Sequence, residues 1–183
     1  LGLGLIEKVQ GNHNDALQSF REAVNSLRSK KIGREQEILL VFNIGLVYNE
    51  NGRFTDAKKY FTEAEGLAHT SGDGIAEGYL NLFGIRCDEQ SMNANQKIQE
   101  VNRLVRDYQA AAQKFQSAGH RSGEAYAHAQ VGRLQEMVGN LVKAREEYRE
   151  AIEVEESTFG EFMVPENHYP YQEALKFSEE RTT

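Results

Sequence analysis

GRFTDAKKYFTEA, residues 52–64, recurs in modified form at two other places in the chain. The related stretches are GNHNDALQSFREA at residues 11–23 and GNLVKAREEYREA at residues 139–151. Each has a glycine, an alanine five residues later, an aromatic residue four residues after that, and an alanine three residues further on. A weaker fourth copy keeps Ala111, Phe115 and Ala118 but lacks the glycine. Internal repeats of this kind predict an array of similar structural units.

The spacing within a copy predicts two helices joined by a tight turn. Alanine, aromatic residue and alanine at i, i+4 and i+7 lie on one helical face, where the small residues allow a neighbouring helix to approach. The glycine is the residue type that most readily ends a helix in a left-handed turn. Another glycine seven residues earlier, at Gly4, Gly45 and Gly132, predicts close packing between the helices before and after the turn. Each copy is therefore expected to be an antiparallel helix hairpin.

The composition also favours an all-α fold. The 183 residues include only two prolines, Pro165 and Pro170, so long helices can run without interruption. The hydrophobic content of 39% is sufficient for a buried core. The first residues form an apolar helical face with no initiator methionine, which suggests a fragment of a longer protein.

The repeated pattern resembles the tetratricopeptide repeat (TPR) family over about residues 1–157. The best copy matches the family consensus at Gly45, Tyr48, Gly52, Ala57, Phe61 and Ala64. The last and first copies have Gln135 and Glu7 in place of the first aromatic residue. The resemblance implies a right-handed α-solenoid of antiparallel helix hairpins, a TPR-like superhelix with about four repeats. These are expected at about residues 1–30, 35–70, 75–118 and 122–157.

Residues 158–183 are expected to form a linker and a short C-terminal capping helix, because solenoids need a cover on the exposed face of their last repeat. An alternative is that this segment lies in the groove of its own or another molecule.

The repeat alanines Ala16, Ala57, Ala111 and Ala144 are unevenly spaced, and the interval from Ala57 to Ala111 is the longest. Repeat units longer than the usual TPR, together with Ser71, Gly72, Asp73 and Glu77, resemble the repeats of LGN-type adaptors and kinesin light chain. The longest interval predicts a long helix from Lys97 to Ala118. Its extra length is either a shelf for a partner or a packing surface for a further neighbour.

The resemblance implies that the first helix of each hairpin lines a concave wall that binds a partner peptide. Asn43 corresponds to an asparagine that grips a peptide backbone in many family members, although it could instead bond within its own repeat. The implied wall residues are Leu39, Phe42, Asn43, Leu46 and Asn49 in the second copy, Asn81, Ile85 and Arg86 in the third, and Tyr126, Ala129, Gln130 and Arg133 in the last.

Several classes of function are disfavoured by the sequence. The net charge of −7, without a basic stripe, argues against a nucleic acid partner. The sequence contains no run of about 18 apolar residues, so it does not predict insertion into a membrane. The histidines show no zinc-binding spacing, and no nucleophile or phosphate-loop motif is present, so we expect no catalytic residues, no metal site and no cofactor. The single cysteine, Cys87, fits a reducing compartment such as the cytoplasm.

The sequence therefore predicts a non-enzymatic scaffold or adaptor that binds a partner peptide or helix in a concave TPR groove. One alternative is a structural element that stacks or forms a homo-oligomer through its repeats. A second is a regulatory subunit or domain of a larger enzyme.

Overall fold

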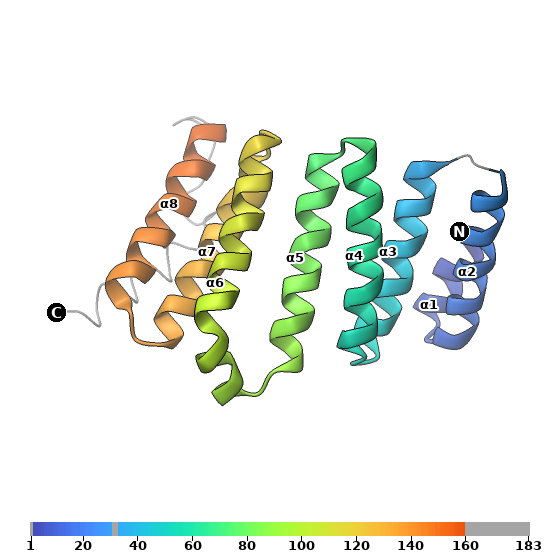
Figure 1. Cartoon of the computed structure of the whole chain (residues 1–183), viewed down its shortest axis with the longest axis horizontal. Coiled ribbons are helices and arrows are strands. Elements are labelled where there is room, and N and C mark those ends of the chain that lie inside the picture. The colour runs from blue at the N-terminus through green and yellow to red at the C-terminus, as the bar shows by residue number, and fades with distance from the viewer. Residues whose placement is uncertain (1, 31–32, 160–183) are drawn as a thin grey trace. The chain divides into compact units, whose positions relative to one another are not determined.

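The computed structural model describes residues 2–30 and 33–159, and these ranges contain eight α-helices and no strand (Figure 1). The predicted all-α helical repeat fold is confirmed. The helices are α1 (Gly2–Val9), α2 (His13–Lys30), α3 (Arg34–Glu50), α4 (Phe54–Ser71), α5 (Gly74–Ser91), α6 (Ala94–Ser117), α7 (Arg121–Met137) and α8 (Leu141–Phe159).

The chain divides into two compact units at Ser91 and Met92. Unit 1 contains α1 to α5, and unit 2 contains α6 to α8. The third predicted repeat, residues 75–118, assigns α5 and α6 to one hairpin, whereas these helices belong to different units. The predicted boundaries of the four repeats stay predictions. The predicted capping helix lies beyond Phe159, outside the described residues.

In unit 1 each helix packs against the next one along the chain, from α1 through to α5. The repeat residues form the centre of this packing: Ala16, Phe20, Ala57, Phe61 and Ala64 are all completely buried. Between the two helices of a hairpin the backbone turns at Gly52, whose φ of 69° is in the left-handed region that glycine adopts most readily. The repeated alanine, aromatic residue and alanine therefore form the interface between neighbouring helices, as the sequence predicts.

In unit 2, α7 packs against both α6 and α8. The third copy of the repeat behaves as in unit 1, with Ala144 and Ala151 completely buried. α6 starts at a capping box, in which the Asn93 side chain accepts from the Gln96 backbone and the Gln96 side chain accepts from the Asn93 backbone. This cap starts the long helix at Ala94, slightly before the predicted start at Lys97.

The weaker fourth copy obtains its close helix contact in another way. A Cβ atom at Gly123 would collide with the ring of Phe115, so α7 lies directly against that ring. In this copy the glycine follows its aromatic residue in the sequence, whereas Gly4, Gly45 and Gly132 precede the rings that they contact.

Candidate peptide-binding pocket

An apolar pocket of about 200 Å³ lies between α3 and α5 in unit 1. Of the described residues that line it, all but one are aliphatic or aromatic, and the exception is an acid. They are Glu35, Ile38, Leu39 and Phe42 from α3, and Ala76, Tyr79, Leu80 and Phe83 from α5.

These residues form pairs of equivalent positions in successive repeats. Each α3 residue has its counterpart on α5 at one constant sequence interval, which is also the interval from Ala16 to Ala57. The pairs are Glu35 and Ala76, Ile38 and Tyr79, Leu39 and Leu80, and Phe42 and Phe83. The pocket therefore lies between equivalent faces of α3 and α5, the first helices of two successive repeats.

The base of the pocket is aromatic. The rings of Phe42 and Phe83 meet edge to face, with centroids 5.0 Å apart. Phe61 of α4 contacts both rings, at 5.7 Å and 5.2 Å, and is itself completely buried. Aromatic pairs in this arrangement add to the stability gained from burial. The base of the pocket is thus held by three helices.

Two large apolar side chains at the rim of the pocket are exposed. Leu39 has 44% of its surface accessible and Tyr79 has 40%, although both are large side chains. Scattered exposed apolar residues are ordinary on protein surfaces. Here, however, two of them flank an apolar pocket, and this arrangement suits an incoming apolar side chain.

The predicted wall residues of α3 lie in different environments. Leu39 and Phe42 line the pocket, and Leu46 is half-buried further along the helix. Asn43 is buried, and its Nδ2 donates to the Leu39 carbonyl oxygen at 2.7 Å. The sequence leaves two roles open for Asn43, namely binding of a peptide backbone or a hydrogen bond within its own repeat. The structure shows the hydrogen bond within its own helix. Asn49 is also engaged, because its Oδ1 accepts from Cys87 Sγ at 3.5 Å.

The predicted wall residues of α5 are not those that line the pocket. Ile85 is buried, and Asn81 Nδ2 donates to Glu65 Oε1 at 3.1 Å. Arg86 is exposed. Sequence reasoning missed the pocket residues of α5, although applying the repeat interval from Ala16 to Ala57 to the α3 residues would have identified them.

The predicted wall residues of unit 2 lie on α7. Tyr126, Gln130 and Arg133 are half-buried, and Ala129 is buried in a small apolar cluster with Ala125 and Ala144. Arg133 Nε donates to Gln130 Oε1 at 3.0 Å. Their role in binding remains a prediction.

His128, in the same helix, contacts Glu147 of α8, with Nδ1 2.8 Å from Oε2. This hydrogen bond is the main cause that raises the pKa of His128, and burial opposes it.

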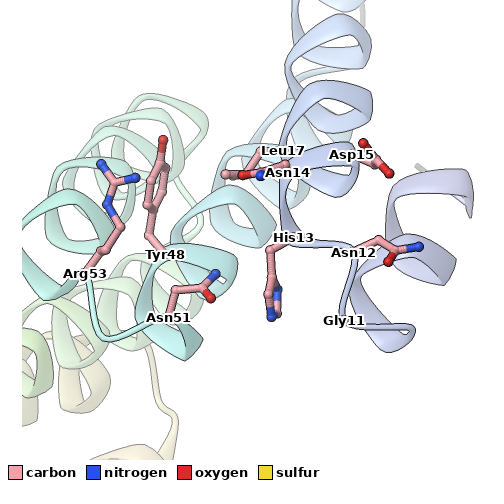
Figure 2. A pocket seen from close by; sticks show the side chains of 9 residues that line it. All are labelled: Gly11, Asn12, His13, Asn14, Asp15, Leu17, Tyr48, Asn51 and Arg53. Carbon is pink, nitrogen blue, oxygen red and sulfur yellow. The ribbon is translucent and has the colours of Figure 1, made fainter.

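A second, polar pocket of about 510 Å³ lies between the α1–α2 turn and the α3–α4 turn (Figure 2). Its one arginine, Arg53, is already engaged: it donates to Asp56 Oδ2 at 2.6 Å and lies 4.6 Å from the Tyr48 ring centroid. Asn51 Nδ2 donates to the Val47 carbonyl oxygen. Because these groups stabilise the turns, we regard the apolar pocket as the better candidate site.

Within 2–30 and 33–159, no group of three or more histidine, cysteine, aspartate or glutamate side chains is arranged to hold a metal ion. Within the same ranges, no helix is both long and apolar enough to cross a membrane.

Comparison with known proteins identifies the type of repeat. A tetratricopeptide repeat model matches residues 40–68, which cover much of α3 and α4. No curated protein matches the chain by sequence.

Two solved structures share the fold. The apo form of RapI superposes on 98% of this chain with a TM-score of 0.78 and 14% identity. BtubC (BKLC) from P. vanneervenii superposes on 98% with a TM-score of 0.74 and 14% identity. The chain spans 46% of the length of RapI and 70% of that of BtubC. At this identity the likeness concerns the fold. Residues 40–68 thus match a tetratricopeptide repeat, and the chain as a whole shares the all-helical repeat fold of these two structures.

Proposed function

We propose that this chain is a non-enzymatic protein-interaction scaffold that binds an apolar segment of a partner protein in the α3–α5 pocket. The observation that carries the proposal is the pocket itself, in which exposed Leu39 and Tyr79 flank an aromatic base. Repeat proteins present such surfaces along the faces of successive helices. A free cysteine, Cys87, supports placing this activity in a reducing compartment such as the cytoplasm.

The pocket can provide only part of the affinity. Burial of one leucine or phenylalanine side chain contributes about 1.5 to 3 kcal/mol, equivalent to about a 10- to 150-fold change in Kd. A useful affinity therefore requires further contacts along the same face, for which half-buried Leu46 is one turn beyond Phe42. A partner segment should thus have one anchor in the pocket and weaker contacts on either side.

The test is a fluorescence anisotropy screen of short synthetic peptides, each with one central leucine, methionine or phenylalanine. At least one peptide should bind saturably to the wild type. Leu39→Ser should weaken that binding about tenfold, because it removes apolar surface from the rim. Ala76→Met should also weaken it, because the longer side chain fills the pocket from within.

The matched control is Val142→Ser, which removes a large exposed side chain from α8 in unit 2. This variant should bind the peptide like the wild type. If no peptide binds, or if the control loses as much affinity as Leu39→Ser, the pocket is not the binding site.

Self-association is the second candidate, because α1 exposes several apolar side chains. The accessible fractions are 64% for Leu3, 57% for Ile6 and 88% for Val9. If this face binds a second copy, sedimentation velocity should detect dimers that Ile6→Glu and Val9→Glu abolish. A monomer across the concentration range would remove this candidate and leave peptide binding unaffected.

A further inference from the structure

Among the described residues that line the apolar pocket, Glu35 is the one with a charged side chain. It is exposed, and none of the described residues forms a hydrogen bond or ion pair with it. Arg34, its neighbour in sequence, contacts Glu37 Oε2 at 3.4 Å, and Arg28 Nε contacts Glu37 Oε1 at 2.7 Å. Both of these guanidinium groups are therefore directed to the other acid of the same helical turn. The pocket keeps one carboxylate that no described cation neutralises.

The size of the pocket limits what can enter it. Sites for drug-sized ligands usually have volumes of about 300–1,000 Å³, and this pocket has about 200 Å³. It therefore suits one side chain rather than a whole helix or a cofactor. The residues beside that anchor would remain at the rim, where the Glu35 carboxylate is exposed to them.

Building on the function proposed above, we propose that the partner segment carries a lysine or arginine next to its apolar anchor, and that this cation pairs with Glu35. A segment with an acid at that position would be repelled. Exposed ion pairs are weak, so the expected preference for the cationic segment over an uncharged one is about two- to fivefold. It should decrease in 1 M salt, where the screening length falls from about 10 Å to about 3 Å.

An acid in the first turn of a helix can also act on the helix alone. Glu35 and Glu37 both lie in the first turn of α3, where a negative charge interacts favourably with the helix dipole. Glu37 thus provides a matched control. If Glu35 acts only on α3, Glu35→Gln will lower the melting temperature without changing which peptides are preferred.

The probe is the tightest-binding peptide from the screen described above, resynthesised with lysine, serine or glutamate at each position within one helical turn's length of its anchor. Anisotropy titrations then compare the wild type with Glu35→Gln, Glu35→Lys and Glu37→Gln. We expect one position at which the wild type prefers lysine over glutamate. This preference should disappear in Glu35→Gln, reverse in Glu35→Lys and persist in Glu37→Gln.

The outcomes separate this inference from the proposed function. If no peptide in the screen binds in a way that depends on Leu39, the proposed function fails and this inference fails with it. If peptides bind through Leu39 but the preference for lysine is absent, or is the same in Glu35→Lys as in the wild type, only the role of Glu35 is overturned.

Discussion

The ring of Phe61 occupies the space into which a side chain at Gly45 would project: a Cβ atom on Gly45 would lie 2.5 Å from Cε1 of that ring. Gly4 and Phe20 have the same relationship one repeat earlier, with a corresponding distance of 2.6 Å. The glycine thus sets how closely the two helices of a hairpin approach each other.

Gly45→Ala should therefore destabilise unit 1 by about 1 to 3 kcal/mol, the usual cost of overpacking a core. Urea unfolding followed by circular dichroism gives this value. Gly66→Ala in α4 is the matched control, because Gly66 is exposed and its added Cβ would meet no atom of another described helix within 4 Å. That substitution should stabilise the helix by about 0.5 to 1 kcal/mol. Equal effects of the two substitutions would contradict the close approach at Gly45.

The helix hairpins could be predicted from the sequence because their cause is local and steric. A small residue, a ring and a second small residue on one face leave few alternatives for the packing of two helices. The pocket residues of α5 could not be found as easily. Arg86 and Glu89 stand at the positions that Gly45 and Tyr48 occupy in the previous repeat, so the consensus that aligns the other copies is missing.

The environment of Asn43 was also open at the level of sequence. A helical asparagine can direct its amide to a ligand or to the carbonyl four residues earlier. Because the residue is asparagine in both cases, the sequence does not distinguish them. In the structure the Asn43 amide is buried, and the Leu39 carbonyl provides the partner that its Nδ2 needs. A contact between Asn43 and a partner peptide stays a prediction.

Ala144→Leu tests the packing of unit 2. Ala144 of α8 is completely buried in a cluster with Ala125 and Ala129 of α7. A larger side chain should therefore lower the free energy of unfolding by about 1 to 3 kcal/mol. Ala110→Leu, at an exposed position of α6, should change it by less than about 0.5 kcal/mol. A neutral Ala144→Leu would mean that the repeat register in α8 is incorrect.

Cys87 should be nearly unreactive in the folded protein. Its side chain is 1% exposed, and burial is the main factor that raises the pKa of the thiol to about 11. At pH 8 the thiolate fraction, and with it the rate of alkylation by iodoacetamide, should be about 100-fold lower than in the unfolded chain. Mass spectrometry of samples labelled with and without urea measures the ratio. Rapid labelling without urea would show that unit 1 opens frequently around α5.

His128 should make the stability of unit 2 depend on pH. The hydrogen bond to Glu147 raises the pKa of His128 above its usual value. The negative charges of Glu147, Glu150 and Glu124 raise this pKa further, because they attract the protonated imidazole. The stabilisation is therefore complete below the unfolded pKa of about 6.5 and is lost as the pH rises through the folded value.

His128→Gln should accordingly destabilise the protein by about 1.5 to 3 kcal/mol at pH 5.5, as expected for a hydrogen bond to a charged group, and by less at pH 9. Urea unfolding of both proteins at the two pH values measures the difference. His69→Gln is the matched control: His69 also contacts a carboxylate, Glu77 at 3.0 Å, but its side chain is 75% exposed, so solvent screens the pair. A His128→Gln deficit that is the same at both pH values would show that the histidine contributes packing rather than charge.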